Sequence, residues 1–331
     1  MRSSLDSLVK HHYRSATVIS GTRKTTASAL TIAAQSKHVE RMQLSSGGSK
    51  RSFLIYRPTA ASRLLVENAA VTALPAILAL HGSFSSAADM MHHTKLNRLA
   101  ERENFLVVYP ELGHRFTIDL TDKQADVDRQ YILDLIRYLV NEENADPRRI
   151  FATGFSSGAD LLHYLASIRE ATSCFNAFAP VCSNMDSRWA EAIDHRAPVS
   201  MIMLSGTDDK LNKWDGQPPK LLSVPETFEF WCRHNEADFR EACSLAFASE
   251  VDNFKHRQTN AEPLTRMELT AAVKESTGAE VVLGKVIGGG HTWPGADQRN
   301  HLLRLICGPT HSLHSASEII WSFFANRPII G

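Results

Sequence analysis

The sequence predicts an α/β fold in which a mostly parallel central sheet carries helices on both faces. Two observations favour this class. Continuous apolar runs recur along the chain, as strands buried on both faces require, and amphipathic helical periods lie between them. No repeat and no Pro/Gly-rich linker interrupts residues 43–331, so we expect a single domain over that range.

The expected strands follow one another along the chain. The first, RSFLIYRP (51–58), alternates apolar and aromatic residues and stops at a proline, which is typical of a strand end. The others are continuous apolar runs: PAILAL (75–80), FLVVYP (105–110), IFATGF (150–155), VSMIMLSG (199–206) and VVLGKVIGGG (281–290).

Segments with a helical period separate these runs. They are ADMMHHTKLNRLAERE (88–103), DVDRQYILDLIRYLVNEE (126–143), GADLLHYLASIRE (158–170) and the closing SASEIIWSFFA (315–325). Residues 210–275 are polar and irregular, and we expect them to form an excursion over the sheet.

Composition limits the possible partners. The 331 residues are 43% hydrophobic, which is enough for a large core, and 36 basic residues balance 36 acidic ones. A chain without net charge has no strong field for nucleic acid or anionic lipid, so a small molecule or a neutral polymer is the favoured partner. No apolar run approaches the ~18 residues of a membrane span, and we expect no membrane partner. The oligomeric state does not follow from the sequence.

Residues 1–42 differ from the rest of the chain. They are rich in Ser, Thr, Lys and Arg, and Asp6 is the only acid before Glu40. The short apolar piece ALTIAA (29–34) lies far from the start for a secretory signal. A poor signal peptide, an organellar transit peptide and a disordered tail all fit this leader.

The five cysteines are Cys174, Cys182, Cys232, Cys243 and Cys307. None are spaced as C-x-x-C, so neither a zinc knuckle nor a thioredoxin-type site is expected. Cys232 and Cys243 would form a bridge in an oxidising compartment, whereas small buried hydrophobic residues are the alternative.

The stretch IFATGFSSGADLL (150–162) contains the main candidate for chemistry. A strand runs into a helix at Gly154-Phe155-Ser156-Ser157-Gly158, which fits the G-x-S-x-G nucleophile elbow. Such a turn strains its central residue, and side chains two positions away on either side would collide, which explains the glycines. Ser156 is therefore the expected nucleophile, and the backbone N–H of Ser157 is an expected oxyanion donor. The alternative is a tight turn whose serines cap the helix.

A serine hydroxyl needs a base and an acid that orients the base, and this fold predicts the order Ser, acid, His. His291 is the expected base, because it directly follows the last predicted strand in GGGHTWPG (288–295). The acid should follow VSMIMLSG, where Asp208 and Asp209 both qualify by position and Asp215 is a distant third.

The second oxyanion donor is expected in the loop after the strand PAILAL. His81-Gly82 ends that strand, and glycine allows the backbone to approach a ligand. We expect the backbone N–H of Ser83 to be the donor, with His81 shaping the loop.

These segments together resemble the polyhydroxybutyrate depolymerase-like esterases of the α/β-hydrolase fold, a family that includes relatives of feruloyl esterases. The resemblance runs from about residue 43 to the end. It rests on LALHGSFSSAADM, LNRLAERENFLVVYPE, ADPRRIFATGFSSGA, GGGHTWPG and SASEIIWSFF, which occur in the family's order.

The resemblance implies more than the residues alone. The family's acid motif is similar to SGTDDKLNKWDG, which places Asp209 at the acid and Trp214 at a following aromatic position. Trp214 and Trp293 are candidates for substrate contact. The family also implies export to the periplasm or the outside of the cell, with a cytoplasmic or organellar location as the alternative.

We therefore expect a serine carboxylic-ester hydrolase that acts on a short-chain hydroxyacyl or feruloyl-type ester, either small or oligomeric. The alternatives are a peptidase or amidase on the same scaffold and an inactive binding protein. No cofactor or metal is expected, because no G-x-G-x-x-G follows the first strands and GGSKRS (47–52) lacks the spacing of a P-loop.

Overall fold

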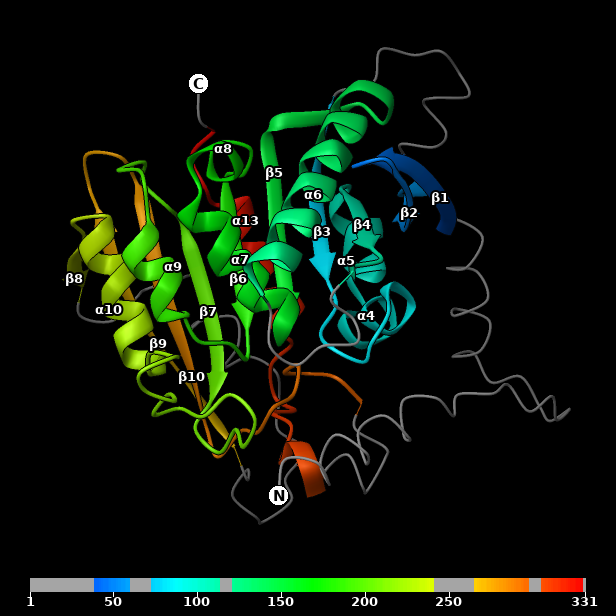
Figure 1. Ribbon diagram of the computed structural model, residues 1–331. Helices are drawn as coiled ribbons and strands as arrows, with labels where there is room; N and C mark the ends of the chain where they lie inside the picture. Colours follow the sequence, from blue (N-terminus) through cyan, green and yellow to red (C-terminus); the bar gives the residue numbers. More distant parts are fainter. Residues whose placement is uncertain (1–38, 60–72, 114–120, 241–264, 298–304, 330–331) are drawn as a thin grey trace, which may run out of the picture.

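A computed structural model describes residues 39–59, 73–113, 121–240, 265–297 and 305–329 (Figure 1). Within these ranges the strands form one ten-stranded sheet in the order β1-β2-β4-β3-β5-β6-β7-β10-β9-β8. The strands are β1 (Val39–Ser46), β2 (Ser49–Tyr56), β3 (Leu74–Leu80), β4 (Leu106–Pro110), β5 (Ala145–Phe155), β6 (Ala177–Val181), β7 (Met201–Gly206), β8 (Asp238–Arg240), β9 (Arg266–Lys274) and β10 (Ala279–Ile287).

The centre of the sheet is parallel and its two margins are antiparallel. β4, β3, β5, β6, β7 and β10 pair in parallel, with Ile77 opposite Phe151 and Val281 opposite Met201. The β1–β2 hairpin adds antiparallel to β4 at one margin, and β9 and β8 add antiparallel to β10 at the other. The predicted α/β-hydrolase fold with a mostly parallel sheet is confirmed.

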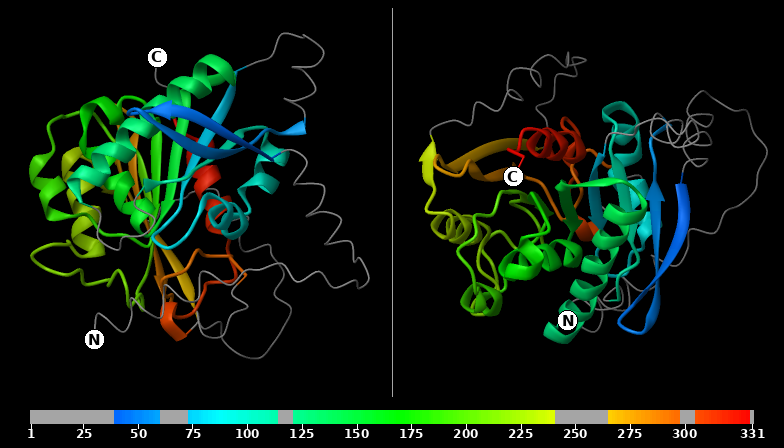
Figure 2. Two further views of the ribbon diagram at one scale, coloured as in Figure 1. Left: turned by 45° about the vertical axis from the view of Figure 1, so that its right-hand side comes forward. Right: turned by 90° about the horizontal axis from the view of Figure 1, so that it is seen from above.

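Helices cover both faces of this sheet. They are α4 (Ala87–Thr94), α5 (Leu96–Glu103), α6 (Asp122–Glu142), α7 (Ser157–Ser167), α8 (Arg169–Thr172), α9 (Ser187–Ala192), α10 (Val224–His234) and α13 (Ala316–Ala325). The view from above in Figure 2 separates α13 on one side of the strands from α6 and α7 on the other.

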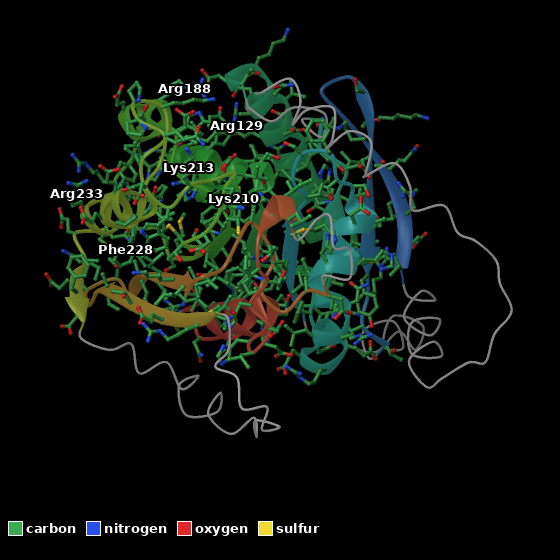
Figure 3. The ribbon with its side chains drawn as sticks, turned by 90° about the horizontal axis from the view of Figure 1, so that it is seen from below. Arg129, Arg188, Lys210, Lys213, Phe228 and Arg233 are labelled. Carbon is green, nitrogen blue, oxygen red and sulfur yellow. The ribbon has the colours of Figure 1, made fainter. Side chains whose placement is uncertain are left out.

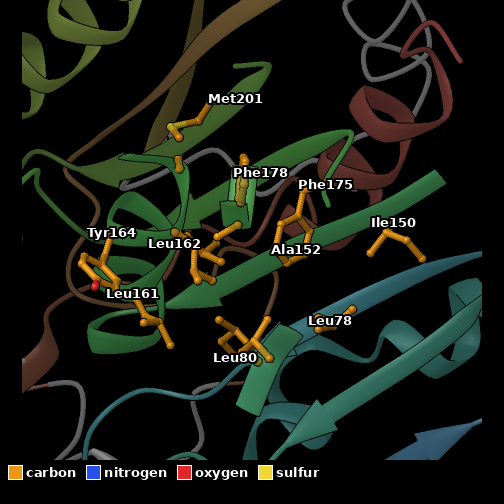
Figure 4. Close-up of a cluster of buried hydrophobic side chains, with 14 of the residues drawn as sticks. Leu78, Leu80, Ile150, Ala152, Leu161, Leu162, Tyr164, Phe175, Phe178 and Met201 are labelled. Atoms are coloured by element: carbon orange, nitrogen blue, oxygen red, sulfur yellow. The ribbon is translucent and has the colours of Figure 1, made fainter. Parts of the chain in front are cut away.

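Two hydrophobic clusters fill the spaces between sheet and helices. Leu78 points into the cluster beneath α6, α7 and α10, part of which is drawn in Figure 4. Its neighbour Ile77 points into the opposite cluster, beneath α4, α5 and α13. This alternation explains why the central strands are apolar throughout, since burying each large apolar side chain contributes ~1.5–3 kcal/mol.

The helix expected over 88–103 is two helices. Lys95, which separates α4 from α5, has a left-handed φ of 55°, and Asn104 ends α5 with a φ of 60°. The helix expected over 126–143 starts earlier, because Thr121 and Gln124 form a capping box at the start of α6.

The expectation for 210–275 is wrong in its described part. That region contains α10, β8 and β9. Ser223 and Glu226 form a capping box at the start of α10, and Trp231 is fully buried beneath the sheet. A sequence that looks polar therefore builds one helix of the covering layer and one margin of the sheet.

Two further expectations concern residues that lie partly outside the described ranges. β1 begins at Val39 and so crosses the expected domain boundary at residue 43, while residues 1–38 of the leader lie outside the described part. Cys243 also lies outside it, and its pairing with Cys232 stays a prediction. None of the helices in the described part is both long and apolar enough to cross a bilayer.

Candidate active site

Ser156 lies at the sharp turn between β5 and α7. β5 ends at Phe155, α7 starts at Ser157, and Ser156 between them has φ 55° and ψ −126°. A residue with a Cβ rarely adopts a positive φ, so the surrounding structure must hold this one in place. One such restraint is the Ser156 N–H, which donates to the carbonyl of Val181 at the end of β6 (3.0 Å).

The two glycines of the motif are required by close backbone contacts. A Cβ on Gly154 would lie 2.5 Å from the carbonyl oxygen of Gly158. A Cβ on Gly158 would lie 2.5 Å from the carbonyl oxygen of Leu80 in β3. Both obstacles are backbone atoms of buried elements, so neither can move aside. The steric reason that the sequence suggests for the glycines is the one that the structure has.

Asp209 and His291 form a buried hydrogen-bonded pair. His291 Nδ1 lies 2.8 Å from Asp209 Oδ2, and their side chains are 5% and 1% exposed. The other carboxylate oxygen, Oδ1, accepts the backbone N–H groups of Leu211 and Asn212, both at 2.8 Å. Since an ionised carboxylate only accepts, Nδ1 carries the imidazole proton and Nε2 keeps its lone pair.

The neighbouring acid Asp208 has a different environment. Its side chain is exposed, and Oδ1 accepts the hydroxyl of Thr207 (3.0 Å). Asp215 is also exposed. Among the three candidate acids, the structure therefore brings Asp209 to His291.

The loop that carries His291 is fixed from both sides. Gly290 donates its N–H to Pro309 (2.8 Å), and the His291 N–H donates to the carbonyl of Cys307. On the other side the His291 ring lies 5.0 Å from the ring of Phe155, measured between centroids. Because Phe155 directly precedes Ser156, this contact brings the His291 loop to the end of β5.

The loop after β3 lies directly against the serine. A Cβ on Gly82 would come within 3.1 Å of the Ser156 Cβ. The Ser83 hydroxyl donates to the Ser157 hydroxyl (2.9 Å), which ties this loop to the first residue of α7. The first N–H groups of a helix have no partner within the helix and attract negative charge. The two residues expected to supply the oxyanion donors are thus neighbours.

His81 shapes this loop, as expected. It is fully buried, and its Nε2 accepts the backbone N–H of Leu112 (3.0 Å). Nδ1 therefore carries the proton and donates to the carbonyl of Gly82 (2.9 Å). The neutral imidazole holds the loop after β3 to the segment after β4.

The chain is similar to known proteins that are named as esterases. The NocK protein of Nocardia uniformis subsp. tsuyamanensis, which is named as an esterase, is 30% identical over 247 residues, or 67% of this chain and 66% of NocK. Feruloyl esterase B of Thermothelomyces thermophilus is 28% identical over 120 residues, or 33% of this chain and 41% of that protein. The family model described as Esterase PHB depolymerase matches residues 60–201. The chain is therefore similar to this esterase family over the matched residues.

A solved structure shows the shared fold. The acetyl xylan esterase from Aspergillus awamori superposes with a TM-score of 0.51 at 14% identity, covering 86% of this chain and 99% of that one. The chain spans less than two thirds of the length of these curated relatives: 66% of NocK and 41% of feruloyl esterase B.

Two tryptophans were expected to contact substrate. Trp293 is 4% exposed, and its Nε1 donates to Ser317 Oγ in α13 (3.3 Å). It packs in the core cluster beneath α13, and its contact with substrate stays a prediction. Trp214 is half-buried, with Lys285 Nζ 5.3 Å from its ring centroid, and its contact with substrate stays a prediction.

The edge of the sheet that carries the candidate site can be followed in the figures. The arrows of β3 and β7 point to the lower edge in Figure 1, and Figure 3 looks at that edge. Lys210 and Lys213, which follow Asp209 on the same turn, are labelled there and are exposed. The acid itself is buried beneath this turn.

Sequence reasoning missed two residues beside the acid. Cys182 follows β6 with a left-handed φ of 57°, and its buried thiol donates to the carbonyl of Thr292 (3.4 Å). Asn212 donates from Nδ2 to the Cys182 carbonyl (2.7 Å), and so ties the Asp209 turn to β6. Nothing in the sequence distinguishes this cysteine from a core residue, since its partners are distant along the chain.

Burial and the nearby Asp209 carboxylate raise the pKa of two thiols. Burial, and then the Asp209 carboxylate, raise the pKa of Cys182 well above its usual value. The same two causes raise the pKa of Cys307 to about 11. Both thiols therefore stay protonated at neutral pH, and neither is activated as a nucleophile.

Proposed function

We propose that this chain is a serine carboxylic-ester hydrolase whose catalytic triad is Ser156, Asp209 and His291. The observation that carries the proposal is the buried Asp209–His291 hydrogen bond at the edge of the sheet where Ser156 is held at a positive φ. Similarity to an esterase family supports the same chemistry.

The proposed reaction starts with the Ser156 hydroxyl. His291 Nε2 takes the hydroxyl proton while the oxygen attacks the ester carbonyl, and Asp209 stabilises the imidazolium that forms. The backbone N–H groups of Ser83 and Ser157 hold the oxyanion of the tetrahedral intermediate. His291 then returns the proton to the leaving alkoxide. Water, activated by the same imidazole, releases the acid from the acyl-enzyme.

The proposed substrates are esters of short-chain hydroxy acids or of feruloyl-type acids, either small or oligomeric. The names of the relatives support this range, since they include a feruloyl esterase and acetylxylan esterases. Trp214 is the aromatic side chain that we propose for substrate contact, because it is half-buried and lies beyond the acid on the same loop.

The test is hydrolysis of p-nitrophenyl acetate, butyrate and octanoate, followed by feruloyl and hydroxybutyrate esters. Ser156→Ala should lower kcat by ~10³-fold or more. Ser157→Ala is the matched control, because its proposed role uses the backbone N–H, and it should stay within about threefold of the wild type. Near-equal losses in the two variants, both folded, would remove Ser156 as the nucleophile.

The same assay addresses the alternatives. A p-nitroanilide hydrolysed as fast as the matching ester would favour an amidase or peptidase. A folded wild-type protein that is inert on every ester and anilide would favour a binding protein.

We also propose, on the family resemblance alone, that the enzyme acts outside the cytoplasm. Fractionation of the source cells, with the amino terminus of the recovered protein sequenced, tests this. Recovery from the cytoplasm with an intact leader would contradict it.

A further inference from the structure

The thiol of Cys182 lies beside the acid–base pair. One ligand atom from each of Cys182, Asp209 and His291 lies within 4.8 Å of the other two, and all three residues are buried. The residues follow three neighbouring strands, β6, β7 and β10. We propose that they bind a thiophilic divalent cation of the Zn²⁺ class, and that the bound ion switches the esterase off. The binding step stands alone, whereas the inhibition rests on the proposed function.

The three donors suit this class of ion. Thiolate, imidazole and carboxylate are the ligands of zinc sites, at ~2.0–2.3 Å from the metal. Mg²⁺ and Ca²⁺ instead need several oxygen ligands, and the cluster offers a single carboxylate. The ligand atoms of a tetrahedral zinc site lie roughly 3.3–3.7 Å apart. Donors within 4.8 Å of each other reach this spacing when the thiol approaches by about 1 Å and the Asp209–His291 contact, now 2.8 Å, opens by about 0.5 Å. A water molecule completes the tetrahedral set.

The charges also balance. A Cys182 thiolate and the Asp209 carboxylate carry two negative charges, which the divalent ion cancels while His291 stays neutral. A neutral cluster avoids the high cost of an unpaired charge in a buried site. A monovalent cation would leave one negative charge uncompensated.

The backbone around Cys182 is already fixed. Its φ of 57° is left-handed, its N–H donates to Leu204 in β7 (2.8 Å), and its carbonyl accepts Asn212 Nδ2 (2.7 Å). The thiol is therefore presented to Asp209 and His291 by two strands and the Asp209 turn. A position fixed in this way lowers the entropy that metal binding has to remove.

The bound ion would act on the tautomer of His291. We infer that Nδ1 is the ligating nitrogen, because it is the one that faces Asp209. When the metal takes the Nδ1 lone pair, the single ring proton moves to Nε2, and the Cys182 thiol proton leaves to solvent. Nε2 then donates and can no longer accept the Ser156 hydroxyl proton. Because the ion lies behind the imidazole, kcat should fall while KM stays unchanged.

Metal binding is tested on the full chain with Co²⁺ as the spectroscopic probe. The wild type should take up one ion per chain with a sulfur-to-cobalt charge-transfer band in the near ultraviolet, and Zn²⁺ should displace it. Cys182→Ala should lose the band. Cys307→Ala is the matched control: it removes a second, half-buried thiol on the residue whose carbonyl accepts the His291 N–H, and it should keep the band. If Cys182→Ala does not fold, Cys182→Ser replaces it.

Inhibition is measured as each variant's activity with Zn²⁺ relative to its own activity with a chelator. The wild type and Cys307→Ala should lose at least ~tenfold in kcat, reversibly, and the loss in Cys182→Ala should be less than about twofold. A missing cobalt–thiolate band in the wild type, or a band or inhibition that survives in Cys182→Ala, overturns the proposal. A chain without esterase activity would defeat the proposed function, yet the cobalt titration would still decide the metal site.

Discussion

Replacement of Asp209 by asparagine is the sharpest test of the triad. The carboxylate is held at both ends: Oδ1 accepts two backbone N–H groups at 2.8 Å, and Oδ2 faces His291 Nδ1 at 2.8 Å. Asparagine keeps the shape but has only one oxygen. Turning the amide so that its NH₂ faces the two backbone donors would leave both unpaired, at ~1–3 kcal/mol each. The amide oxygen therefore stays at the Oδ1 position, and the NH₂ group faces His291.

This orientation reverses the hydrogen bond to the base. The NH₂ group donates to Nδ1, so the ring proton must lie on Nε2, which cannot then accept a proton from Ser156. A serine hydrolase whose acid is changed to asparagine loses ~10⁴ in kcat for this reason. That factor corresponds to about 5 kcal/mol of transition-state stabilisation. We expect a loss of this size for Asp209→Asn, with KM nearly unchanged.

The assay is the initial rate of p-nitrophenyl acetate hydrolysis, with thermal unfolding of each variant measured alongside. Asp208→Asn is the matched control, because that side chain is exposed and contacts the Thr207 hydroxyl. It should stay within about threefold of the wild type. An Asp209→Asn variant that keeps more than about a tenth of the activity, or an equal loss in Asp208→Asn, would refute the assignment of the acid.

Two predictions concern stability. Gly158→Ala should lower the free energy of unfolding by more than ~3 kcal/mol, because its Cβ would meet backbone at 2.5 Å. Gly48→Ala is the control: it has open space around a φ of 76° and should lower the free energy of unfolding by only about 1 kcal/mol. Equal losses in urea unfolding would contradict this prediction. Burial lowers the pKa of His163 in the folded protein to about 3, whereas the same imidazole in the unfolded chain has a pKa of ~6.5. The unfolded state therefore binds a proton more tightly than the folded state, and stability falls as the pH drops below about 6.5. His163→Asn keeps an acceptor for Trp231 Nε1. Between pH ~7 and ~5 its free energy of unfolding should fall by about 2 kcal/mol less than that of the wild type. Parallel plots of unfolding free energy against pH for the two proteins would contradict this prediction.

The fold was predictable where its signals are local. Parallel strands buried on both faces have to be apolar throughout, and PAILAL and VSMIMLSG show this in a few residues. β6 was missed because AFAPV is short and contains a proline, although its neighbours β5 and β7 bury it completely. β1 and β9 lie at or near the margins of the sheet, where half of each strand faces solvent and the apolar signal is weak.

The residues of the candidate site also differ in how far local sequence predicts them. The elbow at Ser156 can be read from the sequence, because the collision that excludes side chains at Gly154 involves Gly158, four residues away. The choice between Asp208 and Asp209 cannot be made from the residues alone and rested on the family resemblance, since both follow β7 and only the direction of the turn decides which carboxylate is buried.

Cys182 shows the limit most clearly. Its thiol is 110 residues from the Thr292 carbonyl that it contacts, and Asn212, 30 residues away, holds its carbonyl. No local pattern encodes a contact between three strand ends, so such a residue is visible only once the sheet order is known. The same reasoning explains why a metal site there would lack the close ligand spacing by which zinc sites are recognised in sequences. If the cobalt titration and the Zn²⁺ inhibition assay both succeed, inhibition by metal ions is a consequence of the strand order β6-β7-β10 rather than of any motif in the chain.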